Sequence, residues 1–388
     1  MRTKVYVNID HIIAVQIGQQ ITNKLEWIYN QWQRILDKQM SLEQEIPIKQ
    51  KCLQWIKVGD KPFQFTDSAL VTQPKDLEQN DVLIQVYSAG VNPIDGKMAA
   101  ENIAHVKLPA VVGYDVSGTI VGIGSSVKDF KIGDDVLGCL TFKRGGGFQQ
   151  YCVTDESVLI KKNPGVSHEQ AASLGVAYLS ALDGLQHVRN QIQGKSVFVP
   201  GGSGGVGHFI VQICKILGAS PLIASASKEE GIKLLKETYH CDHVINHAKE
   251  DVVAKIQEIT VGQGAHIVFD STYISSSFEK SIRSTANGGS WIVLGKFAQE
   301  GSVEEQICQQ QNVKLIHADL GKYSAKPEFE AKRSEFFRQG LKEACEWILQ
   351  GKLKPYINQQ PTIEELETAI EKLRKGQSGF GKVVAKIH

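Results

Sequence analysis

The chain has 388 residues, of which 42% are hydrophobic, 22% charged and 7% aromatic. This length exceeds the size at which a single hydrophobic core usually stops growing, so two domains are expected, and the composition is that of a globular protein. The net charge of +1 provides no field that would attract a nucleic acid, and no apolar run approaches the roughly 20 residues that span a bilayer.

Residues 1–47 form a polar, amphipathic segment that reads as an extension of the rest of the chain. Apolar residues recur in it at intervals of three, four or seven, which predicts a helix over 20–44 with one apolar face. The residues of this face are Ile21, Leu25, Ile28, Trp32, Ile35 and Leu42. The chain's own globular body or a partner chain could cover that face, and the periodicity does not choose between them. A membrane surface is the third alternative, less favoured because the polar face mixes Lys24, Glu26, Arg34 and Asp37.

The start of the chain also bears on its location in the cell. Before Glu26 the only acidic residue is Asp10, against Arg2, Lys4 and Lys24. An acid-poor start followed by an amphipathic helix is typical of proteins addressed to mitochondria. We therefore expect a mitochondrial location, with the cytoplasm as the alternative.

Two patterns succeed each other along the chain. Short β-like runs at 82–86, 118–121 and 135–137, separated by Gly, Pro and Asp, predict a compact β-rich domain from residue 48 to about 175. From 176 to 320 apolar strands alternate with helical stretches, which predicts βαβ units and a parallel, doubly wound sheet. Its predicted strands are residues 196–200, 221–225, 243–245, 266–270, 291–295 and 313–317.

A glycine-rich loop follows the first of these predicted strands and precedes a helical stretch. Gly202, Gly204 and Gly207 fit the pattern G-x-G-x-x-G, with Ser203, Gly205 and Val206 between them. A pyrophosphate must approach backbone N–H groups at the start of the helix, and side chains at these positions would block that approach. The strand, turn and helix context predicts a dinucleotide-binding site rather than a simple turn.

The end of the second predicted strand indicates which dinucleotide is bound. A site for NAD usually places Asp or Glu there, but this strand ends in Ser225, Ala226, Ser227 and Lys228. Hydroxyl donors and an ammonium suit a 2′-phosphate, so NADPH is the expected cofactor. Ser227 could instead cap a helix with Glu230, with Lys228 in solvent, and the two roles are compatible.

The chain resembles the medium-chain dehydrogenase/reductase superfamily, in particular its zinc-free quinone oxidoreductase branch. The resemblance rests on SAGVNPIDGKM, VVGYDVSGTIVGIGSSVKDFKIGDDV, VFVPGGSGGVGHFIVQICKILGA and the ending SGFGKVVAKIH, and it covers residues 48–388. It implies an α/β fold with a GroES-like catalytic domain over 48–175, completed by 321–388, and a Rossmann domain over 176–320. It also implies a dimer, with itself or with a paralogue, through the edge strand near 313–317.

The resemblance implies that no zinc is bound. Where zinc alcohol dehydrogenases carry Gly-His-Glu, this chain has Gly113, Tyr114 and Asp115, and the usual catalytic Cys is missing from the SAGVNP segment. The seven cysteines have no CxxC spacing, and His208, His240 and His243 have no second ligand at a metal-binding spacing. Zinc-free members of this branch reduce quinones or activated alkenes by hydride transfer from the nicotinamide.

The resemblance also implies roles for single residues. Asn92 matches the branch's VNP motif, where its amide binds a substrate carbonyl, although Asn-Pro is also a common turn. Tyr178 and Ser180 fall where relatives place an aromatic residue and a Thr near the nicotinamide, and either residue could simply pack a helix. Gly295 and Phe297 match the loop that passes the nicotinamide ring.

Three further positions complete the expected site. Lys382 matches a Gly-Lys close to the cofactor. Lys97 stands where close quinone reductases have a Tyr, and Asp135 replaces the Arg of the usual Gly-Asp-Arg-Val. Tyr114 is a candidate to replace the missing proton donor, unless it is a buried turn residue.

Two hypotheses of function result. The first is an NADPH-dependent oxidoreductase, active without zinc, that transfers hydride to a quinone or an α,β-unsaturated carbonyl. The second is an accessory or structural subunit that keeps this fold and docks through residues 20–44 into a larger assembly, such as a mitochondrial respiratory one. The motifs favour the first, and the extension motivates the second.

Overall fold

A computed structural model of the chain describes residues 46–142, 146–272, 274–295, 301–325 and 329–388. The chain divides into two units, Met1–Ile46 and Pro47–His388, and the described helices and strands lie in the second. The predicted helix over 20–44 and Phe297 lie outside the described residues, so the docking hypothesis and the role of Phe297 stay predictions.

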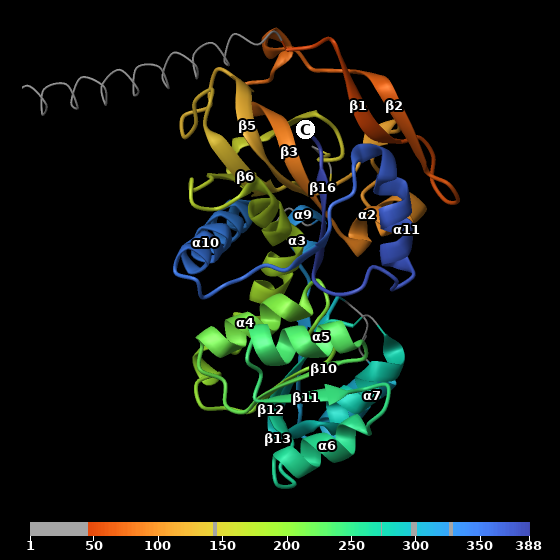
Figure 1. Cartoon of the computed structure of the whole chain (residues 1–388), viewed down its shortest axis with the longest axis vertical. Helices are drawn as coiled ribbons and strands as arrows, with labels where there is room; N and C mark the ends of the chain where they lie inside the picture. The colour runs from red at the N-terminus through yellow and green to blue at the C-terminus, as the bar shows by residue number, and fades with distance from the viewer. Residues whose placement is uncertain (1–45, 143–145, 273, 296–300, 326–328) are drawn as a thin grey trace, which may run out of the picture. The chain divides into compact units, whose positions relative to one another are not determined.

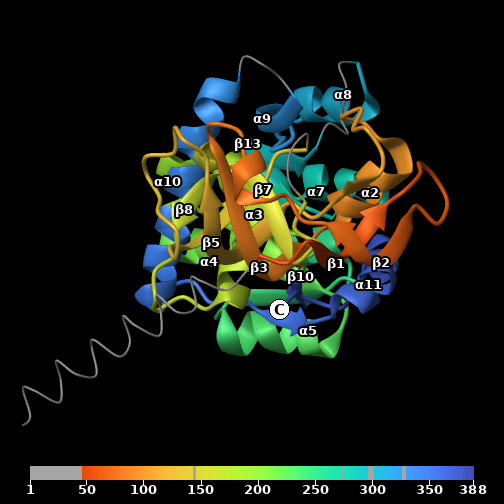
Figure 2. The same cartoon turned by 90° about the horizontal axis from the view of Figure 1, so that it is seen from above.

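The N-terminal half and the end of the chain build two sheets. A seven-stranded sheet has the order β15-β16-β3-β5-β6-β8, with β7 also paired to β3, and a three-stranded sheet has the order β2-β1-β4. Their strands are β1 (Lys49–Trp55), β2 (Phe63–Leu70), β3 (Asp81–Val91), β4 (Ala110–Val111), β5 (Asp115–Ile123), β6 (Asp135–Cys139), β7 (Tyr151–Asp155), β8 (Leu159–Lys161), β15 (Ile357–Gln359) and β16 (Lys382–Lys386). This β-rich part lies in the upper half of Figure 1, and Figure 2 shows β1 and β2 at its side, near α2 and α11.

The middle of the chain builds a six-stranded parallel sheet in the order β11-β10-β9-β12-β13-β14. Every strand predicted over 176–320 is present. The strands are β9 (Val197–Val199), β10 (Leu222–Ala226), β11 (His243–Asn246), β12 (Ala265–Asp270), β13 (Thr285–Leu294) and β14 (Lys314–Ala318). This is the doubly wound Rossmann sheet that the alternation of strands and helices predicts.

Helices cover both faces of the parallel sheet because successive strand residues point to opposite sides. Val197 and Val199 pack with α3 and α4, whereas Phe198 between them packs in a second cluster with α6, α7 and α8. The helices are α2 (Pro93–Glu101), α3 (His168–Leu185), α4 (Gly207–Ile216), α5 (Glu229–Lys233), α6 (Val252–Ile259), α7 (Ser275–Arg283), α8 (Val303–Gln310), α9 (Lys322–Ala325), α10 (Glu330–Leu349) and α11 (Leu366–Arg374). Short 3-10 turns occur at Pro74–Asp76, Glu156–Val158, Arg189–Gln191 and Ile363–Glu365, and a π-helical turn at Leu234–Thr238.

The buried helix α3 links the two parts. Ser167 caps its start: the Ser167 hydroxyl accepts from the Gln170 backbone N–H at 3.2 Å, and Gln170 accepts in return from the Ser167 N–H at 3.1 Å. The helix packs on β3 and β5 of one sheet and on β13 and β14 of the other. The expected boundary between residues 175 and 176 therefore falls inside a continuous helix.

The end of the chain returns to the β-rich part. Strand β16 pairs antiparallel with β3, with Val383 opposite Val91, and α10 packs on α3. The last strand of the chain therefore belongs to the same sheet as β3.

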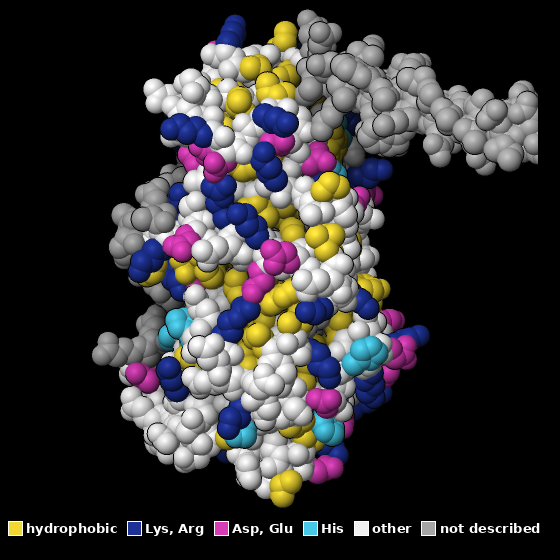
Figure 3. Space-filling model, turned by 90° about the vertical axis from the view of Figure 1, so that its left-hand side faces the viewer, with side chains coloured by type: hydrophobic (Ala, Val, Ile, Leu, Met, Phe, Trp, Pro, Cys, Tyr) yellow, Lys and Arg dark blue, Asp and Glu magenta, His cyan; other side chains and the backbone are white. Residues whose placement is uncertain are grey.

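The surface and the cysteines agree with the composition. Positive and negative side chains are interspersed over the face in Figure 3. In the described ranges, no helix is long and apolar enough to cross a membrane. All seven cysteines are free thiols and buried.

Candidate functional site

The loop between β9 and α4 forms the floor of a cavity of about 470 Å³, called here the glycine-loop cavity. Its walls come from the loop at 200–207, the end of β10, the segment 271–281 and the C-terminal segment 379–383. Among its described lining residues none is acidic and three are lysines. A long cavity with this charge suits a ligand that carries several phosphates.

The glycines of the loop have different reasons to be glycine. A Cβ on Gly207 would overlap the Gly201 carbonyl oxygen, and one on Gly202 would come within 2.9 Å of the Ala224 Cβ. A Cβ on Gly205 would meet only the Gly381 carbonyl oxygen, at 3.6 Å, and the Lys382 stem, at 3.8 Å. The fold itself thus requires Gly207 and Gly202, whereas Gly205 leaves space that a pyrophosphate can use.

His208, directly after the loop, forms a hydrogen bond with the loop backbone. The side chain is buried, and its Nδ1 lies 3.0 Å from the Gly204 carbonyl oxygen. A carbonyl only accepts, so Nδ1 carries the proton. Burial lowers the pKa of His208 to about 4, which keeps the ring neutral. His208 is a structural residue, as its lack of a second metal ligand indicates.

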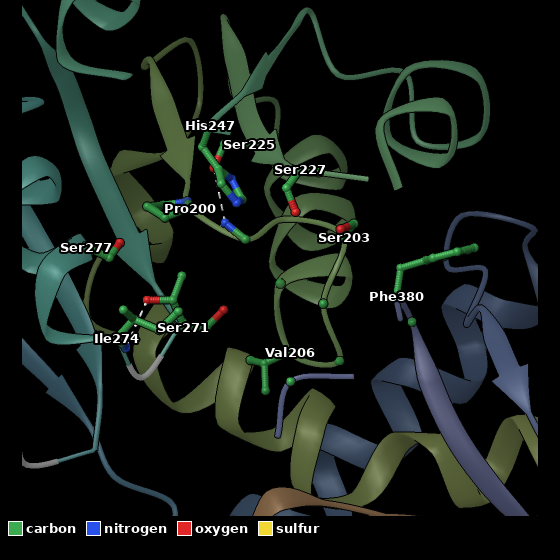
Figure 4. A pocket seen from close by; sticks show the side chains of 18 of the residues that line it. Pro200, Ser203, Val206, Ser225, Ser227, His247, Ser271, Ile274, Ser277 and Phe380 are labelled. Carbon is green, nitrogen blue, oxygen red and sulfur yellow. Dashed lines mark hydrogen bonds between the residues drawn. The ribbon is translucent and has the colours of Figure 1, made fainter. Parts of the chain in front are cut away.

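The end of β10 closes one end of the glycine-loop cavity. The Ser225 hydroxyl accepts from the Gly201 N–H at 3.3 Å and lies 3.3 Å from His247 Nδ1. Figure 4 shows Ser225, Ser227 and His247 together at this end of the cavity, away from Val206. Ser227 does not cap α5: the residue before that helix is Lys228, and no side chain caps it.

Two residues that no sequence pattern indicates join this end. His247 follows β11, and Lys280 lies in α7. Neither Lys228 nor Lys280 forms an ion pair in the described part of the chain. The pKa of His247 is lowered, first by burial and then by the charge of Lys280. Sequence reasoning misses these positions because the fold brings together a residue that follows β11 and a residue of α7, and no local pattern links them.

Asp270, at the end of β12, fixes the opposite wall. Its buried carboxylate accepts from the Thr272 N–H at 2.9 Å and the Thr272 hydroxyl at 2.7 Å. It also accepts from the hydroxyls of Ser277, at 2.8 Å, and Ser281, at 2.7 Å. Four donors on one carboxylate hold Thr272 and helix α7 in place.

The C-terminal segment passes over the glycine loop. The Gly381 N–H donates to the Ser203 carbonyl oxygen at 2.7 Å, and the Lys382 side chain runs beside Gly205. The stem of Lys382 therefore lies beside the glycine loop, and its proximity to a bound cofactor stays a prediction.

The ammonium of Lys382 is buried in a cluster of charged and polar groups. Its Nζ donates to Asn92 Oδ1 at 2.7 Å and to the Val91 carbonyl at 3.3 Å, and it lies 3.6 Å from Asp115 Oδ2. Lys382 is 3% exposed and Asp115 is fully buried. Burial lowers the pKa of Lys382 and raises that of Asp115, and the attraction between the two opposes both shifts.

Asn92 has no free hydrogen-bonding group for a substrate. Its Nδ2 donates to Asp115 at 2.8 Å and to the Gly90 carbonyl at 3.4 Å, while its Oδ1 accepts from Lys382. Its backbone N–H donates to the Asp95 carboxylate at 2.7 Å, and burial raises the pKa of Asp95 well above its usual range. The expectation that Asn92 binds a substrate carbonyl is therefore corrected: the residue holds Lys382 and starts α2.

A second cavity of about 670 Å³, called here the hydrophobic cavity, adjoins the first. Pro93, at the start of α2, lines both cavities. On α3, Ala177 lines the glycine-loop cavity, whereas Val176 and Ser180 line the hydrophobic one. The apolar residues that line the hydrophobic cavity are Pro93, Ile94, Ala100, Ile103, Ala104, Cys139, Leu140, Phe142, Val176, Leu294, Ala318, Leu320 and Phe337.

The remaining predicted site residues divide between this cavity and the core. Ser180, Gly295 and Lys97 line the hydrophobic cavity. Tyr178 lines neither cavity: its ring is fully buried against Phe209, with 5.7 Å between the ring centres. The expected substrate contact of Tyr178 is corrected to helix packing.

Tyr114 and Asp135 also lie away from both cavities. The Tyr114 ring is 3% exposed and packs edge-on against Phe142, with 4.9 Å between the ring centres. Because the buried Tyr114 side chain lines neither cavity, the alternative of a buried turn residue holds and the proton-donor role is corrected. Asp135 accepts from the Thr119 hydroxyl at 2.6 Å on β5.

The positions at which zinc alcohol dehydrogenases carry their ligands are arranged around a lysine in this chain. Within the described ranges, no group of three or more His, Cys, Asp or Glu side chains is arranged to hold a metal. The segments with Asn92 and Asp115, where the zinc enzymes carry ligands, meet instead around the Lys382 ammonium. A buried cation at this point repels a second one.

Comparison with known proteins agrees with this architecture. Residues 78–164 match the alcohol dehydrogenase GroES-like domain, and residues 205–336 match the zinc-binding dehydrogenase family. Quinone oxidoreductase from Homo sapiens is 28% identical over 342 residues, which cover 86% of this chain and 98% of the relative. The NADPH-dependent alkenal/one oxidoreductase of Arabidopsis thaliana chloroplasts is 32% identical over 229 residues, or 56% of each chain.

Solved structures share the fold. The quinone oxidoreductase of Pseudomonas syringae is 24% identical and superposes with a TM-score of 0.75 over 87% of this chain and all of that one. The quinone oxidoreductase of Coxiella burnetii is 25% identical, with a TM-score of 0.72 over 88% of this chain and all of the other. This protein is therefore a member of the medium-chain dehydrogenase/reductase superfamily of oxidoreductases, related to quinone oxidoreductases and alkenal/one oxidoreductases.

Proposed function

We propose that the protein is an NADPH-dependent reductase that transfers hydride to a quinone or an α,β-unsaturated carbonyl without a metal ion. The observation that carries this proposal is the junction of the two cavities at Pro93 and α3. A phosphate-binding cavity that opens beside an apolar one can bring a dinucleotide and a hydrophobic substrate together. The names of two relatives, a quinone oxidoreductase and an alkenal/one oxidoreductase, give the two substrate classes.

The charge of the glycine-loop cavity supports NADPH over NADH. Ser225, Ser227, Lys228, His247 and Lys280 line the end away from the hydrophobic cavity. An adenosine 2′-phosphate carries close to two negative charges, and two lysines without ion-pair partners in the described ranges can stabilise them. No carboxylate among the described lining residues would bind a free ribose 2′-hydroxyl instead.

The chain's own residues hold the cofactor and exclude water in this reaction. NADPH, when bound, supplies the hydride, so the protein needs no redox group of its own. The backbone N–H groups of Gly205 and Val206 hold the pyrophosphate, since the Gly204 N–H donates to the Gly201 carbonyl at 2.9 Å. The hydrogen bond from the Gly381 N–H to the Ser203 carbonyl keeps the C-terminal segment over the loop. Apolar walls exclude water from the transfer. No zinc takes part, since the Lys382 ammonium stands between the segments that would supply the ligands.

The proposal is tested by fluorescence titration of the purified full chain with NADPH and, in parallel, with NADH. We expect micromolar affinity for NADPH, at least tenfold weaker binding of NADH, and oxidation of bound NADPH when a simple quinone or an alkenal is added. The variants Lys228→Glu and Lys280→Glu should weaken NADPH binding by about tenfold each and leave NADH binding unchanged. Equal affinities for both cofactors would contradict the assignment of NADPH, and binding without oxidation would contradict the reductase.

A further inference from the structure

We infer that the hydroxyl of Ser180 binds the substrate carbonyl oxygen in the hydrophobic cavity, and that the substrate is a hydrophobic enone or enal. This inference deepens the proposed function and rests on it. It moves Ser180 from the cofactor, where the resemblance places it, to the substrate.

The Ser180 hydroxyl is buried but has no protein partner among the described residues. The residue is 4% exposed and lines the hydrophobic cavity, and its side chain makes no hydrogen bond within the described part of the chain. A serine inside a helix normally donates to a carbonyl three or four residues earlier. Ser173 on the same helix does so, to the Gln170 carbonyl at 2.6 Å. The free hydroxyl of Ser180 therefore points to a ligand.

Ser180 is also the one uncharged hydroxyl or amide side chain among the described residues that line this cavity. The thiol of Cys139 is a weak donor, and burial raises its pKa well above the usual range. The other polar side chains are charged. Lys97, Glu101 and Arg374 are exposed at the rim.

The two remaining charged lining residues are less suited to bind a neutral carbonyl. Lys322 donates to the buried carboxylate of Asp183 at 2.7 Å, and Asp319 can only accept when ionised. Ser180 is therefore the uncharged side-chain donor that the described lining offers to a neutral carbonyl.

The position on α3 suits the reaction. Ser180 lies one helical turn from Val176 on the same cavity wall, and Ala177, which lines the glycine-loop cavity, is adjacent to Val176. When hydride is transferred to the β-carbon of an enone, negative charge develops on the carbonyl oxygen. The Ser180 O–H stabilises that charge, and the α-carbon then takes a proton from water to give the saturated ketone.

The test compares Ser180→Ala, Ser180→Thr and the control Ser173→Ala with the wild type. We expect Ser180→Ala to lower kcat/KM for a medium-chain 2-alkenal by about 10- to 100-fold while the Kd for NADPH changes less than twofold. Ser180→Thr keeps the hydroxyl and should retain most of the activity. Ser173→Ala removes a buried serine of the same helix outside both cavities and should keep kcat/KM within twofold.

Other outcomes overturn the inference. An unchanged kcat/KM in Ser180→Ala does so, and so does a weaker NADPH affinity with unchanged kcat, which would place the hydroxyl on the cofactor. If the wild type reduces neither alkenals nor quinones, the proposed function fails. Calorimetric binding of the saturated ketone 2-octanone to the NADP⁺ complex then decides: loss of affinity in Ser180→Ala supports the carbonyl site, and equal or absent binding overturns it.

Discussion

The buried ion pair between Lys382 and Asp115 makes the sharpest prediction about stability. The two groups are 3% and 0% exposed, and the Lys382 ammonium also donates to Asn92 at 2.7 Å. In Lys382→Met the methionine keeps most of the volume but leaves the Asp115 carboxylate without its cation. Removing one partner of a buried pair costs about 3–5 kcal/mol, so we expect a loss of that size in the free energy of unfolding at pH 7.5.

The charge-balanced double variant Lys382→Met/Asp115→Asn separates charge from packing. It leaves no unpaired charge, and the amide can still accept from the Val176 N–H, which bonds the Asp115 carboxylate at 2.6 Å. We expect the double variant to recover more than half of the lost free energy, measured by urea unfolding monitored by circular dichroism.

The pH dependence has a definite sign. Without the ammonium, the pKa of Asp115 in the folded state rises further above its value in the unfolded state. The destabilisation caused by Lys382→Met is therefore largest at high pH, and it becomes smaller as the pH falls and Asp115 takes up a proton.

The matched control is Lys162→Met. Lys162 is also buried, but its partner Asp135, at 3.8 Å, has a side chain that is 44% exposed. That exposed partner limits the ion-pair loss to about 1 kcal/mol. Equal losses in the two single variants, or no recovery in the double variant, would refute the reasoning.

Three further predictions concern the glycine-loop cavity and the thiols. The pKa of His247 is lowered in the free protein, and a bound 2′-phosphate would raise it. When the pH is lowered from 7.5 to 5.5, the affinity for NADPH should therefore increase relative to the affinity for NADH. The variant His247→Asn should remove this difference in a fluorescence titration. Gly205→Ala should weaken NADPH binding more than tenfold with little change in Tm, whereas Gly207→Ala, whose Cβ would overlap the Gly201 carbonyl, should destabilise the fold by about 1–3 kcal/mol in thermal unfolding. All seven cysteines are buried, and burial raises the pKa of Cys52, for example, to about 11. A chromogenic disulfide reagent should therefore react fast with fewer than one thiol per chain in the folded protein and with seven thiols after urea is added. A fast-reacting thiol in the folded protein would contradict the burial.

The strands and the glycine loop could be predicted from the sequence because their signals are local. The run Val197–Val199 is apolar on both faces, as a strand covered by helices must be, and the loop at 201–207 directly follows it. The prediction that the end of β10 binds a phosphate also rests on local signals, the side chains of Ser225 and Lys228.

The roles of Asn92 and Tyr178 could not be predicted because they depend on contacts between distant parts of the chain. The partner of Asn92 is Lys382, 290 residues later, and the Tyr178 hydroxyl donates to Glu343 at 3.3 Å, 165 residues later. The same holds for His247 and Lys280, which reach the cavity from loops and helices without a motif. A motif gives the type of a residue, but only the packed structure shows whether its hydrogen-bonding atoms are still free.

The shared helix α3 also affects how the enzyme can change over evolution. Adjacent residues on it, Val176 and Ala177, face the two different cavities. Consecutive positions on a helix are separated by a fixed rise of about 1.5 Å and a rotation of about 100°, so the spacing between the two cavity walls is built into one rigid element. In the proposed reaction, new substrates can therefore arise by exchanging side chains on the surrounding walls, whereas an insertion or deletion of a single residue within α3 would misalign the two cavities.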